Sequence, residues 1–313
     1  MRIKPVSSSA PGSLMLMGEH AVLRNHLAIC AAIDHRLTVE IQPNHERVCV
    51  IDSALQKGSF AFEDLPTTGP LRFVAQCIRE RFEPANEGGV TVRIRSELPT
   101  TVGLGSSAAV VVALMHGLAL AQGRTEDPLS LQQASLKVIQ VVQGRGSGAD
   151  VAASVAGGCV AYRVAPCVMR RYAAVPPLAV FYSGAKRPTV EVVAEVDARA
   201  ASEPDHYEAL FAKMDALSVN AESALERQDW IQLGQLMTQG QRLMEAIGVS
   251  NDRLRGMLDT LVRAEGVLGA KISGSGLGDC VVALGQVSDD VLREDRVSVQ
   301  LSPNGVSGEM LCV

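Results

Sequence analysis

The segment GLGSSAAVVVALMHGLALAQG, residues 103–123, opens with two glycines and two serines and continues as a long apolar run. Its many alanines and leucines predict a helix, although the β-branched residues 110–112 oppose that preference. Because the run is apolar nearly all round, we expect the helix to lie buried at the centre of the fold. Ser106 or Ser107 would be its natural N-cap.

The start of this segment also has the composition of a turn that binds anions. Glycines let the backbone approach an anion closely, and the free N–H groups at a helix start carry a charge of about +0.5. A serine hydroxyl beside them can bind phosphate or Mg²⁺. The pattern matches neither the Walker A nor the Rossmann signature, and it contains no lysine. A phosphate loop and a tight turn that only caps a core helix both fit these residues.

Three further turns carry polar groups. Residues 146–150, GSGAD, end in Asp150, which could accept a proton from a substrate hydroxyl or could cap the next helix. Residues 274–279, GSGLGD, form either a second anion-binding turn or a flexible loop. Residues 18–21, GEHA, could orient a small acid or polyol, or be an exposed turn. Glycine loses much conformational entropy on folding. The three glycine-rich clusters at 103–108, 146–150 and 274–279 are therefore hard to explain as connectors alone.

The composition is that of a globular chain without nucleic-acid or membrane character. Its 313 residues allow about two domains, and 47% of them are hydrophobic. The formal net charge of −5 and the lack of a Lys/Arg cluster argue against a nucleic-acid partner. No apolar run reaches the ~20 residues of a membrane span. Seven scattered cysteines without a CxxC pair argue against a disulfide framework. We therefore expect a cytoplasmic protein with no membrane partner.

Helical and strand patterns are mixed along the rest of the chain. Alternating apolar residues or short apolar runs predict strands, and apolar residues three and four apart predict helices. The expected strands cover 14–17, 37–41, 47–51, 89–94, 178–182, 297–301 and 310–313, and the expected helices cover 70–82, 129–143, 189–201, 205–226 and 251–266. Residues 268–285 are expected to form a strand, a glycine-rich turn and a second element. This order lacks βαβ regularity, so it favours an α+β fold with a domain boundary near residues 163–177.

Together these segments resemble the GHMP kinase superfamily. The stretches that carry the resemblance are APGSLMLMGEHAVL (10–23), LPTTVGLGSSAAV (98–110) and KISGSGLGDC (271–280), which follow the order and spacing of three family motifs. The resemblance implies an α+β fold of two domains. Residues 1–172 would form a ribosomal-protein-S5-like N-terminal domain and residues 173–313 a ferredoxin-like C-terminal domain, with the ATP site in the cleft between them.

Within the superfamily, the chain is most similar to the mevalonate kinases. LAVFYSGAKRPTVE (178–191) and GVSNDRLRGMLDTLV (248–262) resemble segments of that branch. The reaction implied is ATP-dependent phosphorylation of the 5-hydroxyl of mevalonate in isoprenoid biosynthesis, with Mg²⁺ as cofactor. QGRGSGAD (143–150) and GDC (278–280) are more similar to phosphomevalonate kinases. A phosphorylated acceptor therefore stays open, as does a nucleotide-binding protein that has lost catalysis.

The resemblance also implies roles for individual residues. Asp150 would be the catalytic carboxylate that polarises or deprotonates the acceptor hydroxyl, and Ser107 would bind Mg²⁺ and the phosphates of the nucleotide. Glu19, His20 and Thr189 would surround mevalonate. The backbone that holds ATP would consist of Gly103, Leu104, Gly105, Ser106, Ser107 and Ala108, with Gly274, Ser275 and Gly276 closing the site. A homodimer is expected from the same resemblance.

Two positions depart from the family pattern. The first motif normally begins APGK, and this chain has Ser13 at the position of that lysine. Mevalonate kinases also place a Mg²⁺-binding glutamate upstream of the catalytic Asp, whereas residues 137–148 contain no acidic residue. Lys186 or Arg145 is the candidate for the missing positive charge.

Overall fold

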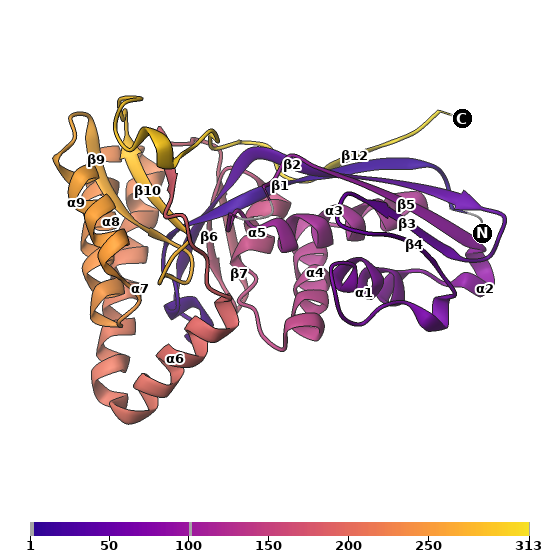
Figure 1. Cartoon of the computed structure of the whole chain (residues 1–313), viewed down its shortest axis with the longest axis horizontal. Helices are drawn as coiled ribbons and strands as arrows, with labels where there is room; N and C mark the ends of the chain where they lie inside the picture. The colour runs from indigo at the N-terminus through magenta and orange to yellow at the C-terminus, as the bar shows by residue number, and fades with distance from the viewer. Residues whose placement is uncertain (1–2, 100–101, 313) are drawn as a thin grey trace.

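Two sheets with helices packed against them form the computed structural model of the chain, which describes residues 3–99 and 102–312 (Figure 1). Within these residues, one sheet has eight strands and the other has four. The mixture of helices and antiparallel strands confirms the predicted α+β class.

The eight-stranded sheet is built mainly from the first half of the chain. Its order is β12-β1-β2-β5-β3-β4, with β6 added to β2 and β7 added to β6. Only the β3–β5 pairing is parallel among the described strands. The strands are β1 (Val6–Met17), β2 (Ala28–Asn44), β3 (Cys49–Ser53), β4 (Lys57–Phe60), β5 (Gly89–Ser96), β6 (Cys159–Arg163), β7 (Val168–Tyr172) and β12 (Ser307–Met310).

The helices of this part lie below the sheet in Figure 1. They are α1 (Arg72–Arg81), α2 (Pro84–Glu87), α3 (Ser106–Ala121), α4 (Pro128–Gln143) and α5 (Ala149–Ala156), and short 3₁₀ turns cover Ala21–Arg24 (η1) and Phe62–Asp64 (η2). As predicted, α3 is central: eleven of its residues are buried, and it packs against β1, β2 and α1.

The prediction for the start of α3 was wrong. Its N-cap is Gly105 rather than Ser106 or Ser107, and Gly105 adopts a left-handed conformation with φ +70°. A Cβ at this position would lie 2.1 Å from Ser13 Oγ, so a residue with a side chain would collide with β1. Glycine is needed here for both its conformation and its lack of a side chain.

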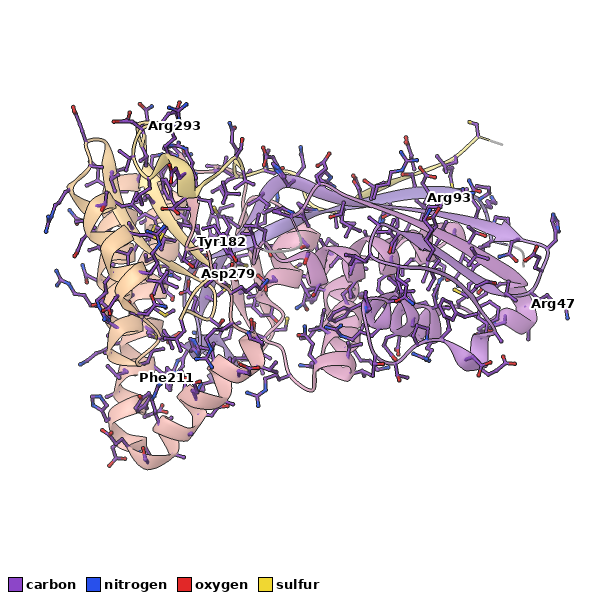
Figure 2. The ribbon with its side chains drawn as sticks, in the orientation of Figure 1. Arg47, Arg93, Tyr182, Phe211, Asp279 and Arg293 are labelled. Carbon is purple, nitrogen blue, oxygen red and sulfur yellow. The ribbon has the colours of Figure 1, made fainter. Side chains whose placement is uncertain are left out.

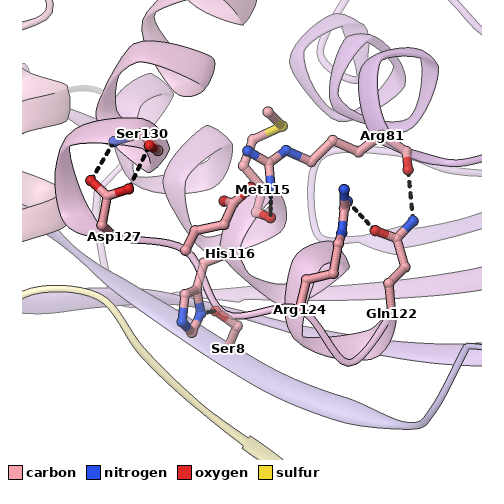
Figure 3. A network of polar contacts seen from close by, with 9 residues as sticks. Ser8, Arg81, Met115, His116, Gln122, Arg124, Asp127 and Ser130 are labelled. Carbon is pink, nitrogen blue, oxygen red and sulfur yellow. Dashed lines mark hydrogen bonds and ion pairs between the residues drawn. The ribbon is translucent and has the colours of Figure 1, made fainter.

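The C-terminal end of α3 is held by the polar network drawn in Figure 3. Arg81 of α1 donates to the carbonyl of Met115 at 3.2 Å and pairs with Glu126 at 2.6 Å. Gln122 donates to the carbonyl of Arg81 at 2.7 Å, and Arg124 donates to Gln122. These contacts join α1 to the second half of α3 and to the residues that follow it.

The four-stranded sheet is antiparallel and has the order β11-β8-β10-β9. Its strands are β8 (Leu178–Tyr182), β9 (Val267–Ser273), β10 (Cys280–Gly285) and β11 (Arg296–Val297). The helices of this part, at the left of Figure 1, are α6 (Thr189–Ser202), α7 (Pro204–Arg227), α8 (Trp230–Ala246) and α9 (Asp252–Arg263), and η3 covers Arg293–Asp295. The element after the 274–279 turn is thus a strand.

Helix α8 is the main element that the sequence analysis missed. Gly234 and Gly240 weaken its helical propensity. Their place in the fold explains them, because a Cβ on Gly234 would lie 2.4 Å from the carbonyl oxygen of Leu268 in β9. The helix and the strand approach so closely that only glycine fits between them.

The C-terminal segment returns to the first sheet. In Figure 1 it runs along that sheet to β12, which pairs with β1. The strands predicted at 297–301 and 310–313 were therefore misplaced: β11 ends at Val297, β12 ends at Met310, and residue 313 lies outside the described part. The boundary at residue 172 stays a prediction. In the described part of the chain, no helix combines the length and the apolar character that a bilayer crossing requires.

Candidate active site

The 103–108 loop lies directly against β1. The Ser13 N–H donates to the carbonyl of Leu104 at 3.0 Å, and a Cβ on Gly12 would lie 2.5 Å from the same oxygen. The pairing of β1 with β2 shifts register between Pro11 and Ser13. Such an irregularity re-aims side chains next to a site, and here it brings Ser13 beside the loop.

The first turn of α3 has no capping side chain among the described residues. No described side chain accepts a hydrogen bond from its N–H groups, and the turn contains no acidic residue. The Ala109 N–H is bonded to Gly105, and the three N–H groups before it, of residues 106–108, belong to the unsatisfied end of a helix. Ser106 and Ser107 are partly exposed there. Uncapped N–H groups and serine hydroxyls together form a seat for an anion.

Asp150 faces this loop from the first turn of α5. It does not cap that helix, because the N-cap is Gly148 and no side-chain cap bond is formed. Instead Asp150 Oδ1 accepts a hydrogen bond from Ser13 Oγ at 3.0 Å. A Cβ on Gly105 would lie 2.1 Å from the same hydroxyl oxygen, so the Ser13 side chain lies beside both the carboxylate and the loop.

Two opposing influences act on the Asp150 carboxyl. The side chain remains accessible to solvent, yet the protein atoms around it desolvate the carboxylate and raise its pKa. The negative charge of Asp279 raises this pKa further, whereas the Ser13 hydrogen bond and the positive charge of Lys186 lower it. A carboxyl with a raised pKa is a stronger base once it has lost its proton, which suits general-base catalysis.

Asp279 reaches the loop from the other sheet. Its Oδ1 accepts a hydrogen bond from the Gly103 N–H at 2.6 Å. Desolvation raises the pKa of Asp279, while the Gly103 hydrogen bond and Lys186 lower it. Lys186 is thus a cation that acts on both carboxylates, and its own side chain is exposed.

Arg145, the other candidate for the missing charge, is engaged elsewhere. It donates to Asp197 of α6 at 3.2 Å, and Arg24 of η1 donates to the same carboxylate at 2.7 Å. Thr189 is exposed at the first position of α6. The structure therefore separates Arg145 from the Asp150–Asp279 pair and brings Lys186 to it.

The third glycine-rich turn packs against the GVS segment. The Leu277 N–H donates to the carbonyl of Val249 at 2.8 Å, and a Cβ on Gly276 would lie 2.3 Å from that oxygen. Ser275 accepts a hydrogen bond from His20 Nε2 at 2.8 Å. The turn therefore contacts two distant segments of the chain, through Val249 and His20.

Glu19 and His20 are buried beside this turn. The Lys271 ammonium of β9 donates to Glu19 Oε1, and both side chains are almost fully enclosed. Burial lowers the pKa of His20, which keeps the ring neutral near pH 7. Its Nδ1 is buried and has no hydrogen-bond partner among the described residues. The sequence analysis did not single out Lys271, and only its position two residues before Ser273, inside the third motif, could have drawn attention to it.

The residues near the loop offer oxygen donors. Asp150 and Asp279 supply carboxylates, and Ser106 and Ser107 supply hydroxyls. Oxygen ligands of this kind suit Mg²⁺, which usually completes its coordination shell with water and substrate phosphates. Among the described residues, no three His, Cys, Asp or Glu side chains gather into a ready-made metal site.

Comparison with known proteins gives a consistent pattern. Residues 71–158 match the family described as GHMP kinases N terminal domain, and residues 221–295 match GHMP kinases C terminal. The chain is 33% identical to a mevalonate kinase of Thermococcus onnurineus, with 89% of each chain covered. It is 32% identical to one of Methanothermobacter thermautotrophicus, covering 88% of this chain and 89% of that one. The solved Lin0012 protein of Listeria innocua shares its fold with a TM-score of 0.85 at 20% identity, covering 97% and 99% of the two chains.

Proposed function

The chain belongs to the GHMP kinase family and is an ATP-dependent small-molecule kinase, and from this premise we propose that it phosphorylates the 5-hydroxyl of mevalonate. The observation that carries the choice of acceptor is the similarity to proteins named mevalonate kinase over about nine-tenths of the chain. The products would be 5-phosphomevalonate and ADP.

Asp150 is the residue we propose as general base. The acceptor oxygen forms the new O–P bond while the bond between the γ-phosphorus and the bridging oxygen breaks, and ADP leaves with that electron pair. The hydroxyl proton passes to Asp150, whose carboxylate is accessible and is oriented by Ser13. Positioning and electrostatic stabilisation supply most of the catalysis in such transfers.

The 103–108 loop would hold the phosphates through the uncapped N–H groups of α3. Ser107 would bind Mg²⁺, which supplies positive charge to the phosphate oxygens when it is bound with ATP. Gly274, Ser275 and Gly276 would close the nucleotide side. Lys186, rather than Arg145, would supply the cation that the loop lacks, because it acts on both Asp150 and Asp279.

For the acceptor, the contact of His20 with mevalonate stays a prediction: its Nδ1 has no hydrogen-bond partner among the described residues, but protein atoms enclose it. Glu19 would act by fixing the end of β1, since Lys271 already occupies its carboxylate. The contact of Thr189 with mevalonate stays a prediction, as do the homodimer and the cytoplasmic location.

A phosphorylated acceptor would need unpaired cations near the site. Instead Arg145 is paired with Asp197, and Arg187 is paired with Glu195 at 2.6 Å. Lys186 remains as an exposed cation near the site, so the pairing of the two arginines only reduces the positive charge available to a phosphorylated acceptor, and the choice of mevalonate rests on the similarity to proteins named mevalonate kinase.

An acceptor screen tests the proposal. ADP release is measured with mevalonate, phosphomevalonate, homoserine and galactose at equal concentrations. We expect mevalonate to give the highest kcat/KM. A preference for another acceptor would refute the substrate, and ATP binding without turnover on any acceptor would refute catalysis.

A further inference from the structure

Asp279 stands out because it is an acidic side chain placed on a loop that is built for anions. Its Oδ1 lies 2.6 Å from the Gly103 nitrogen, and the two residues are 176 positions apart in the chain. A Cβ on Gly103 would lie 1.7 Å from Asp279 Oδ2, so the carboxylate packs directly against the backbone of Gly103.

The backbone of Asp279 is itself fixed. Its N–H donates to the carbonyl of Ala185 at 2.6 Å, and its carbonyl accepts from the Ser183 N–H at 2.9 Å. Asp279 has a left-handed conformation with φ +64°, which Asp and Asn adopt more readily than most residues. Figure 2 shows Asp279 next to Tyr182 at the end of the four-stranded sheet, on the side that faces the first sheet. The carboxylate is therefore presented from a rigid support.

The seat for phosphate stays open beside this contact. Asp279 occupies the N–H of Gly103, and the N–H of Leu104 donates to Val102. Both lie before the first turn of α3, whose N–H groups at residues 106–108 are not used by Asp279. The carboxylate thus fixes the entry of the loop without filling the place where an anion would bind.

We propose that Asp279 is a positioning residue for phosphoryl transfer, which holds the 103–108 loop in shape through the Gly103 N–H. The inference rests on the proposed role of that loop in nucleotide binding. It assigns Asp279 no contact with substrate: the residue acts through the backbone that holds the phosphates, and its charge acts on Asp150.

The charge of Asp279 has a separate consequence that gives an independent readout. Asp150 is faced by Ser13 from β1, by Cys30 from β2, and by Asp279 and Lys186 from the other sheet. Asp279 is faced in turn by Lys186, Tyr182 and Cys280. Since Asp279 raises the pKa of Asp150, its neutralisation lowers that pKa.

Two substitutions separate the hydrogen bond from the charge. Asp279→Gly removes the carboxylate and tolerates the left-handed backbone, whereas Asp279→Asn keeps an acceptor oxygen and removes only the charge. The readouts are the Kd of Mg·ADP by calorimetry, the KM for ATP, kcat, and the acid limb of the pH profile of kcat/KM. Thermal unfolding reports whether each variant keeps its fold.

We expect Asp279→Gly to weaken Mg·ADP binding and raise the KM for ATP by about tenfold or more, the size expected for the loss of one hydrogen bond to a charged group. Asp279→Asn should restore both values to within about threefold, and should move the acid limb to lower pH. Wild-type affinity in Asp279→Gly would overturn the proposal, as would an Asn variant as weak as the Gly variant.

The two proposals fail in different ways. If Asp279→Gly does not fold, Asp279→Ala decides through the same hydrogen bond: Mg·ADP binding weakened by about tenfold supports the inference, and wild-type affinity overturns it. If the wild-type protein prefers another acceptor, the proposal that mevalonate is the substrate is refuted. The calorimetric comparison of the Asp279 variants would still stand, and the acid limb would then be measured with the preferred acceptor.

Discussion

The two ends of α3 treat the helix backbone in opposite ways. At the C-terminal end, the last carbonyls accept from backbone N–H groups, that of Ala119 from Arg124 and that of Ala121 from Lys4, and the Arg81 side chain donates to the carbonyl of Met115. At the N-terminal end, Gly105 takes the capping position and no described side chain caps the helix. The same buried helix thus has its backbone groups paired at the end that only has to stay in place. Its backbone donors stay uncovered where, as we propose, a nucleotide binds.

The largest expected effect comes from the carboxylate that faces the open end. Asp150→Asn removes the proposed base, so kcat should fall by about a thousandfold, within the range for general-base catalysis, while the Kd of Mg·ADP stays within about threefold. Steady-state kinetics and calorimetry measure the two quantities. Asp127→Asn is the matched control, because Asp127 caps α4 near the other end of α3 and should not affect kcat. Near-normal turnover in Asp150→Asn would remove Asp150 from the mechanism.

Two glycines give the next test, because both ends of α3 carry one with similar φ. Gly105→Ala places a Cβ 2.1 Å from Ser13 Oγ at φ +70°, so it must move the loop or Ser13. We expect Mg·ADP affinity to fall by at least about tenfold, equivalent to about 1.4 kcal/mol.

Gly123→Ala is the control for backbone strain alone. Its φ is +72°, but no described atom outside its immediate neighbours lies within 4 Å of the new Cβ. It should reduce the free energy of unfolding by about 1 kcal/mol and leave nucleotide affinity unchanged. Equal losses of affinity in both variants would show that the two ends do not differ in function.

Arg81→Met tests the contacts near the C-terminal end of α3. The Arg81 side chain is 8% exposed and Glu126 is 20% exposed, so the pair is largely shielded from water. Its loss should reduce the free energy of unfolding by about 2 kcal/mol, measured by urea denaturation. The KM for ATP should stay the same; a large rise would mean that this network also shapes the distant loop.

The smallest expected effect concerns Lys186. Its positive charge lowers the pKa of Asp150, so Lys186→Ala should raise that pKa. Because the base must be deprotonated, the acid limb of kcat/KM then moves to higher pH, opposite to the shift expected for Asp279→Asn. Arg145→Ala serves as control, since Arg145 is paired with Asp197. An unshifted limb in Lys186→Ala, or an equal shift in Arg145→Ala, would remove Lys186 from this role.

These features differ in how far they follow from the sequence. The apolar runs of α3 and β8 are local patterns, and both elements appear where predicted. Helix α8 was missed because its glycines serve a contact with β9, which no local pattern contains. The α+β class and the family motifs were likewise readable in advance.

In the site, too, local patterns could be predicted from the sequence and long-range contacts could not. The turns around Gly103, Asp150 and Gly274 could be recognised as candidates from their composition. Their geometry could not: the Ser13–Asp150 bond spans 137 positions and the Gly103–Asp279 bond spans 176. The Glu19–Lys271 pair spans 252 positions. Contacts of this kind depend on how β1 and the two sheets meet, so they follow only from the folded chain.

Amide hydrogen exchange with and without Mg·ADP tests the central claim most directly, because it reports on both ends of α3 in one experiment. The account predicts that nucleotide slows exchange in residues 103–108 and leaves residues 121–127 unchanged. Unchanged exchange in 103–108, with protection elsewhere in a protein that demonstrably binds the nucleotide, would contradict it.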